Sequence, residues 1–266
     1  MMCRFSRLVV AAAAAALVPL TAVHAHGEYD AELDELHEHI DDYRAEVERL
    51  MGEAEEIVET RRDGGEAAAM IDNLIDSWEE VGIHGAIELH ASVTYPGVWQ
   101  GLVELQEAVE SDADIDRVQA AADELAAALW QGLGAVRLVA SQVESGEVES
   151  APSGPPGGDS GEQIAHIQDE LKQAVAAYDD GDLERAEKLI HDAYMKRFEF
   201  LEGDLIAQDA ELVEQLELDF NAGLPRLMQQ GAELEKVRAK LDEMLAELDR
   251  ADQLLTEAES DRESVF

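Results

Sequence analysis

Cysteine is almost absent from this 266-residue chain, since only Cys3 is present, in a short amino-terminal segment of distinct character. Disulfide bonds, thiol catalysis and thiolate metal sites are therefore excluded for the remainder of the chain. Basic residues are scarce as well, with 19 Lys and Arg against 61 Asp and Glu and a formal net charge of −42. Nucleic acid is excluded as a partner, because binding its phosphates requires clustered basic side chains.

Long hydrophobic runs are confined to the amino terminus. Arg4 and Arg7 precede an apolar run over residues 8–20, and small residues follow up to Ala25. This pattern predicts a signal peptide over residues 1–25 that is cleaved after Ala25. No later segment approaches the roughly 20 apolar residues that span a bilayer. We therefore expect a periplasmic or secreted protein with no direct membrane insertion.

The excess of Asp and Glu residues has two interpretations. One is a solvated surface suited to a halophilic medium, where salt screens the repulsion between like charges. The other is cation binding. Because carboxylates are spread over every predicted helix, most of them indicate a surface rather than a site.

Helix patterns dominate and strand patterns are nearly absent, while aromatic residues make up only 5% of the chain. Apolar residues recur at spacings of three and four in residues 32–62, as expected for one face of a long helix. This stripe comprises Leu33, Leu36, Ile40, Tyr43, Val47, Leu50 and Ile57. Similar patterns predict a helix over 66–92, a helix that begins near Pro96 and ends before a turn at 111–116, and a helix from that turn to about 145. Further helices are predicted over 162–179, 182–207, 209–222 and 232–258. The fold class is therefore all-α.

A stretch rich in Ser, Gly and Pro interrupts the helical patterns at residues 148–161. Such composition is typical of a linker. It divides the chain into an amino-terminal part (26–147) and a carboxy-terminal part (162–258), followed by a tail (259–266). Each part offers about four helices with short connections, which predicts two antiparallel helical bundles.

Glu199 and Glu202 form the first candidate metal site. Residues three apart share one face of a helix, so the two carboxylates can chelate a hard cation. Glu187 and His191 lie on earlier turns of the same predicted helix and are candidate assisting ligands. The alternative is a pair of surface glutamates, because the same spacing recurs by chance in Glu53/Glu56, Glu56/Glu59, Glu211/Glu214 and Glu214/Glu217. The neighbouring Tyr194 and Phe198 are predicted core residues.

Glu80, His84 and Glu88 form the second candidate. Spaced by four, they fall in a line on the face of the helix predicted over 66–92. The arrangement suits a metal ion, and it equally suits an ion-paired face without metal. Ligands from a second helix would be needed to complete a site, and sequence does not identify them.

Histidines near the amino terminus suggest a third kind of site. They are His24, His26, His37 and His39. A chain that begins at His26 after cleavage carries an imidazole beside a free amine, a combination that binds Cu²⁺, so copper is a second candidate ion. The alternative is a terminus without a defined structure.

Enzyme signatures are absent from the sequence. The Glu-x-x-His pairs of di-iron bundles, the His-Glu-x-x-His zinc helix, a phosphate-binding glycine loop and a Gly-x-Ser-x-Gly elbow do not occur. We therefore expect a protein that is not an enzyme and has no catalytic residues.

The segment from Tyr178 to Phe220 resembles the exported soluble region of bacterial high-affinity, oxidase-linked iron permeases. The matching positions are Tyr178, Gly181-Asp182, Ala193-Tyr194, Phe198-Glu199, Glu202, Asp209 and Glu217 to Phe220. The resemblance covers about residues 173–248 and implies that Glu199 and Glu202 bind iron. Two features depart from the family: its membrane helices with an Arg-Glu-Gly-x-Glu motif are absent, and "NAGLPRL" follows where Leu-Arg is expected.

These observations lead to two functional expectations. The first is an exported, non-enzymatic metal-binding or accessory component of iron uptake, whose partner is a membrane iron permease or another periplasmic transport component. The alternative is an acidic helical scaffold that docks a protein partner and has no specific metal site.

Overall fold

The computed structural model describes residues 33, 35–111, 113–146 and 159–264, and the side chains of these except for 261–264. Every regular element in these ranges is helical, which confirms the all-α prediction. The helices before the predicted linker are α1 (Leu36–Arg62), α2 (Ala68–Glu79), α3 (Gly82–His90), η1 (Ser92–Thr94), α4 (Tyr95–Glu110) and α5 (Ile115–Glu144). Those after it are α6 (Ser160–Asp179), α7 (Leu183–Ala193), η2 (Tyr194–Phe198), α8 (Glu199–Leu218), η3 (Asp219–Gly223), α9 (Leu224–Gln229) and α10 (Leu234–Ser264).

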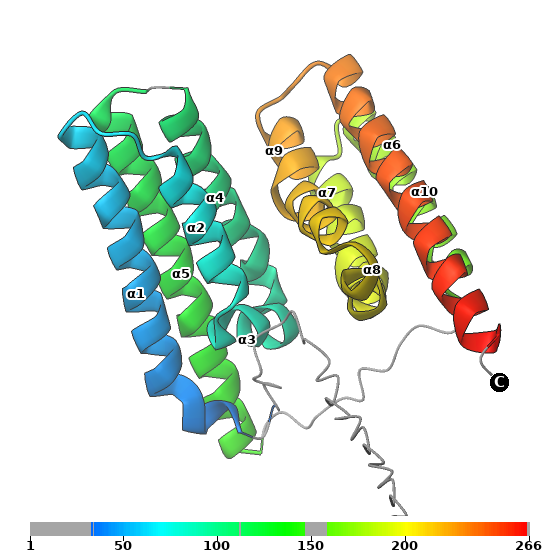
Figure 1. Cartoon of the computed structure of the whole chain (residues 1–266), viewed down its shortest axis with the longest axis horizontal. Coiled ribbons are helices and arrows are strands. Elements are labelled where there is room, and N and C mark those ends of the chain that lie inside the picture. Colours follow the sequence, from blue (N-terminus) through cyan, green and yellow to red (C-terminus); the bar gives the residue numbers. More distant parts are fainter. Residues whose placement is uncertain (1–32, 34, 112, 147–158, 265–266) are drawn as a thin grey trace, which may run out of the picture.

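The helices form two groups that lie side by side (Figure 1). In the first group α5 packs along both α1 and α4, and in the second α6 packs along both α7 and α10. The groups meet where α4 contacts η3. Buried apolar side chains of both groups belong to one continuous cluster, so the two halves share a core.

Most predicted helices are present, with different limits in three places. The expected apolar stripe of α1 is buried at Leu36, Tyr43, Val47, Leu50 and Ile57. The single helix expected over 66–92 is two helices, α2 and α3. The helix expected over 182–207 contains the π-helical segment η2, and it meets its successor at Asp209, a non-helical residue inside α8 (φ −160°, ψ 86°). The carboxylate of Asp209 accepts a hydrogen bond from the backbone N–H of Leu212 at 3.1 Å, so the predicted boundary is present as a kink. The expected tail at 259–266 is largely part of α10. The predicted signal peptide, and the linker up to residue 158, lie outside the described residues.

Short polar side chains and glycines define the helix ends. The carboxylate of Asp114 accepts a hydrogen bond from the backbone N–H of Arg117 and caps α5, and Asp159 and Asp182 cap α6 and α7 in the same way. Gly64, with a φ of 77°, follows the end of α1, as the left-handed conformation there favours glycine.

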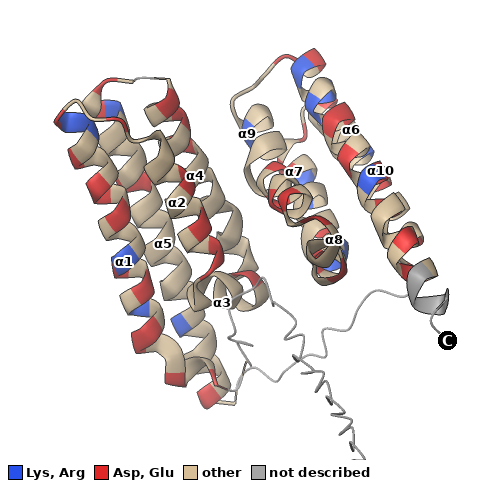
Figure 2. Cartoon of the chain, viewed as in Figure 1, with Lys and Arg blue, Asp and Glu red and all other residues tan. Residues whose placement is uncertain are grey.

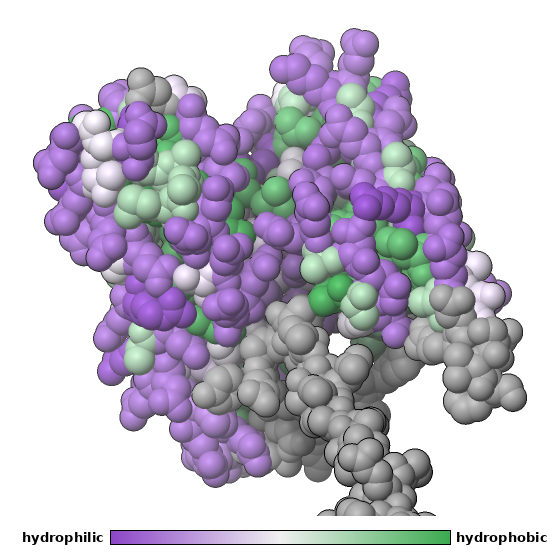
Figure 3. All heavy atoms as spheres, viewed as in Figure 1, coloured by the Kyte–Doolittle hydropathy of each residue, from purple (hydrophilic) through white to green (hydrophobic). Residues whose placement is uncertain are grey.

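Asp and Glu positions are spread along the helices of both groups (Figure 2). The space-filling view shows hydrophilic residues over most of the visible face, with only small hydrophobic areas between them (Figure 3). This distribution supports the interpretation of most carboxylates as a solvated surface. Within the part of the chain that the structure describes, no helix combines the length and apolar character needed to cross a membrane.

Gly101 allows α4 to approach α5 closely. A Cβ atom at this position would lie 2.8 Å from the Cα atom of Leu125, and backbone cannot move aside as a side-chain tip can. We expect Gly101→Ala to lower the free energy of unfolding by about 1–3 kcal/mol, as overpacking typically does. Gly134→Ala is the matched control, because Gly134 in α5 is exposed with no atom near its Cβ position. Urea unfolding of both variants would contradict the account if Gly101→Ala were as stable as the control.

Candidate metal site

The amino-terminal half contributes His84 and Glu88 to the site, and a break between α2 and α3 sets the direction of the helix that carries them. Val81 has an extended conformation, with a ψ of 146°, so the chain changes direction before α3 begins. The carboxylate of Glu46 on α1 then accepts hydrogen bonds from the backbone N–H groups of Gly82 and Ile83, at 3.3 and 2.8 Å. These free N–H groups at the start of a helix favour a carboxylate. Glu46 therefore fixes the direction in which α3 presents its side chains.

His84 and Glu88 extend from α3 into the interior, and each has only 2% of its surface exposed. The ring of His84 stacks on Trp78, with 4.7 Å between the ring centroids. Its Nε2 atom lies 2.7 Å from the hydroxyl of Tyr95 and 3.8 Å from Oε2 of Glu88. Packing on one side and hydrogen bonding on the other thus hold the imidazole in place.

Two π-helical segments shape the contribution of the carboxy-terminal half. η2 begins at Tyr194 and leads directly into Glu199, while η3 begins at Asp219, two residues after Glu217. A π-helical turn inserts an extra residue and so rotates the side chains that follow it relative to those before. Such turns occur frequently at functional sites. Here one directly precedes Glu199 and the other closely follows Glu217.

Two buried tyrosines connect the halves through carboxylates. The hydroxyl of Tyr194 lies 2.6 Å from Oε1 of Glu88 and 2.9 Å from Oε1 of Glu217. The hydroxyl of Tyr95 donates to the same Glu217 oxygen at 3.0 Å. A hydroxyl has one proton, so Tyr194 cannot donate fully to both carboxylates at once. Without a cation, this network is best satisfied when one of the carboxyl groups carries a proton.

Burial and mutual repulsion make the glutamates of this cluster hard to ionise. Burial, and then the charge of Glu202, raise the pKa of Glu199 from 4.5 to about 8. Burial raises the pKa of Glu202 well above its usual range, and the charges of Glu217 and Glu88 add to the effect. The same surroundings raise the pKa values of both Tyr95 and Tyr194. Without a bound cation, carboxyl groups of this cluster therefore keep protons that solvated glutamates would lose.

The ligand atoms of the cluster fall into two overlapping groups of three. One group is His84, Glu88 and Glu217, and the other is Glu88, Glu199 and Glu202. Within each group, one ligand atom of each residue lies within 4.8 Å of those of the others. Carboxylate oxygens with one imidazole nitrogen suit iron and manganese, and also suit zinc. The arrangement can hold a divalent or trivalent cation at the interface between the halves.

The structure therefore brings four of the predicted ligands together: Glu199 and Glu202 from one prediction, and His84 and Glu88 from the other. Glu80 does not join them. The expected line of Glu80, His84 and Glu88 on one helix face is wrong, because α2 ends before Glu80 and its side chain is exposed. The alternative of a pair of surface glutamates is also wrong for Glu202, which is 1% exposed.

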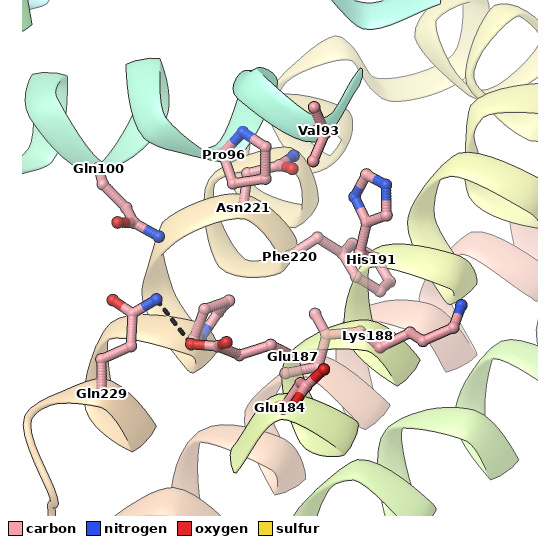
Figure 4. A pocket seen from close by; sticks show the side chains of 12 residues that line it. Val93, Pro96, Gln100, Glu184, Glu187, Lys188, His191, Phe220, Asn221 and Gln229 are labelled. Carbon is pink, nitrogen blue, oxygen red and sulfur yellow. Dashed lines mark hydrogen bonds between the residues drawn. The ribbon is translucent and has the colours of Figure 1, made fainter. Parts of the chain in front are cut away.

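Glu187 and His191 line a different cavity, with a volume of about 340 Å³ (Figure 4). Glu187 accepts a hydrogen bond from Nε2 of Gln229 at 2.9 Å, and burial lowers the pKa of His191. Neither belongs to the two ligand groups. The cavity nevertheless adjoins the cluster, because its lining includes Phe220, whose ring lies 5.7 Å from that of Tyr194.

The two amino-terminal histidines that the structure describes, His37 and His39, belong to neither ligand group. His24 and His26 lie outside the described residues, so the copper hypothesis remains a prediction. His37 and His39 lie on α1, at 3.9 and 3.8 Å from carboxylate oxygens of Glu38 and Asp42.

Three residues of the cluster were not predicted as site residues. Glu217 was one of several glutamates with chance spacing, although the iron-permease resemblance includes it. Tyr194 was predicted to be core and is indeed fully buried, but its hydroxyl also joins the site. Tyr95 appeared only as part of a helix start. A polar atom at the end of an otherwise buried aromatic side chain is the signal that could have identified both tyrosines.

Comparisons with known proteins give no family assignment. No family model matches the chain, and neither the curated proteins nor the solved structures include a match.

Proposed function

We propose that this protein is an exported, non-enzymatic iron-binding component of iron uptake, similar to the soluble part of an iron permease. The observation that carries the proposal is the convergence of four glutamates and one histidine, from both halves of the molecule, in an interior location. Buried carboxylates are costly unless a cation or protons neutralise them. This cluster lowers the stability of the metal-free fold, so a contribution to stability does not explain it. Ligand binding does, and the two buried tyrosines and the two neighbouring π-helical turns fit that explanation.

Iron is the ion that fits both the donors and the resemblance. Carboxylate and imidazole ligands accommodate Fe²⁺, and carboxylates with phenol oxygens accommodate Fe³⁺. The resemblance over residues 173–248 independently points to Glu199 and Glu202 as iron ligands. A membrane iron permease is the proposed partner, and the periplasm is the proposed location. The acidic surface would serve solubility in salt rather than the specific site.

The experiment is a calorimetric titration of residues 26–266 in high salt with Fe²⁺ under anaerobic conditions, and with Mn²⁺, Cu²⁺ and Ca²⁺. High salt screens the diffuse attraction of the acidic surface, so heats from formed sites should persist. We expect saturable iron binding that releases protons, because the carboxyl groups must ionise to bind the ion. Comparison of two buffers with different ionisation enthalpies measures that release. Weak and similar heats for all four ions would instead favour the acidic scaffold that docks a protein partner.

A further inference from the structure

We infer that the interior cluster holds two metal ions at neighbouring positions, with Glu88 as the ligand shared between them. One position is formed by His84, Glu88 and Glu217, and the other by Glu88, Glu199 and Glu202. This inference rests on the proposed function, because it concerns the same site, and it specifies how many ions are bound and how.

The position of Glu88 is the first argument. It is the one residue common to both ligand groups found among the described residues. Its carboxyl group contacts members of both groups: Oε2 lies 3.8 Å from Nε2 of His84, and a side-chain hydrogen bond joins Glu88 to Glu199. A carboxylate in contact with ligands of both positions is placed to bridge two cations.

Charge balance is the second argument. When ionised, the four glutamates of the cluster carry four negative charges, and the neutral imidazole of His84 adds none. A single divalent ion would compensate two of these charges, and two carboxyl groups would have to keep their protons, among residues that are 1–4% exposed at Glu88, Glu202 and Glu217. Uncompensated buried charge is strongly unfavourable. Two divalent ions neutralise all four carboxylates without any retained proton, so the charge of the cluster suits a pair of ions.

The origin of the ligands is the third argument. His84 and Glu88 come from α3, whereas Glu199, Glu202 and Glu217 come from α8. Within α8, the first two directly follow η2, while Glu217 closely precedes η3. Each of the two positions therefore combines α3 with a different end of α8, and each end adjoins its own π-helical segment. Such segments are frequent where function requires a particular direction of side chains.

The two positions differ in chemistry. The position that includes His84 offers one nitrogen and two carboxylates, and Tyr95 and Tyr194 both contact its Glu217. The other offers carboxylate oxygens only. Imidazole favours the later transition metals, whereas all-oxygen sites favour harder ions such as Mn²⁺ and Ca²⁺. We therefore expect the ions at the two positions to bind with different affinities.

The test uses Mn²⁺ as the probe, with the complete protein, in high salt. Bound manganese is counted by elemental analysis after desalting, and electron paramagnetic resonance distinguishes isolated ions from a coupled pair. We expect two Mn²⁺ per chain, with the six-line spectrum of isolated ions replaced by that of a spin-coupled pair. One bound ion per chain, with an uncoupled spectrum, would overturn the pair while leaving the proposed function intact. No bound manganese, together with no bound Fe²⁺, would overturn both.

Glutamine variants assign the positions. Glu217→Gln and Glu199→Gln should each reduce the stoichiometry from two ions to one and restore the uncoupled spectrum. Glu88→Gln should remove the coupling and weaken both ions. Glutamine has the shape of a protonated glutamate, so the fold should persist, and circular dichroism checks this. Glu211→Gln is the control, because Glu211 is an exposed glutamate of the same helix. Two coupled ions retained in Glu88→Gln would contradict the bridging role.

Discussion

Replacing Glu199 and Glu202 together by glutamine should weaken Fe²⁺ binding by at least about 100-fold. Loss of even an outer partner of a ligand commonly costs 10–100-fold in metal affinity, and this variant removes two direct carboxylate ligands. Glutamine is preferable to alanine, because Glu202 is 1% exposed and truncation would leave a cavity in the interior. Calorimetric titration in high salt measures the effect, and circular dichroism verifies that the helices remain.

The matched control for this variant lies on the same helix. Glu211 and Glu214 have the same spacing of three, and both side chains are exposed. Replacing them by glutamine also removes two carboxyl groups from α8, and it leaves the cluster unchanged. We expect Fe²⁺ affinity to stay within about threefold of that of the original protein, because surface charges are screened in salt. Equal losses in both double variants would mean that iron senses the overall negative charge, and the site assignment would fail.

The metal-free protein should lose stability as the pH rises from about 5 to 9. Glu199 has a pKa of about 8 in the folded chain, against 4.5 when solvated. The folded state therefore holds this proton more tightly than the unfolded state does. Its stabilising effect is complete below about pH 4.5 and is lost progressively as the pH rises through 8. A pKa that rises from 4.5 to about 8 corresponds to roughly 5 kcal/mol at high pH.

Glu202 acts in the same direction, because burial also raises its pKa. A typical domain is stable by only about 5–15 kcal/mol, so this loss is a large fraction of the total. Urea unfolding in a chelator and high salt, at pH 5, 7 and 9, measures the trend. Glu199→Gln should be more stable than the original protein at pH 9 and should show a flatter dependence on pH. If both proteins followed the same pH curve, Glu199 would have to be ionised without cost, and the account of the buried cluster would fail.

Bound metal should reverse the dependence of stability on pH that is expected for the metal-free protein. Ions bind the ionised carboxylates, so their affinity increases with pH. The stabilisation by a bound ligand grows with its affinity. A cluster that weakens the metal-free fold and strengthens the loaded one illustrates the common conflict between stability and a functional site.

Local pattern was sufficient to predict the helices and part of the site. The stripe from Leu36 to Ile57 repeats often enough to define α1, and the capping aspartates define several helix starts. Glu199 and Glu202 could be paired because they are adjacent on one helix. These features depend on neighbours in sequence, where spacing translates directly into direction.

The rest depended on tertiary contacts. The expected alignment of Glu80 with His84 assumed a continuous helix, but Val81 is extended and Glu46 on another helix fixes the new start. Glu217 lies 122 residues from Tyr95, and no local pattern reports that their side chains meet. The π-helical turn before Glu199 is likewise invisible to a count in steps of 3.6 residues. The burial of Glu202 was not predicted, because a glutamate in an acidic chain is ordinarily exposed to solvent.

The location of the cluster between the two halves also determines when it can assemble. Hydrogen bonds across it join residues 106 and 122 positions apart, whereas most packing within each half is between helices nearer in sequence. Contacts across such separations form late in folding, since the intervening chain must first be ordered. Ions would then recognise two halves that have already folded and met. Their binding would leave the rate of folding nearly unchanged and would slow unfolding. The folded state with bound ions would therefore last longer, although it would not form faster.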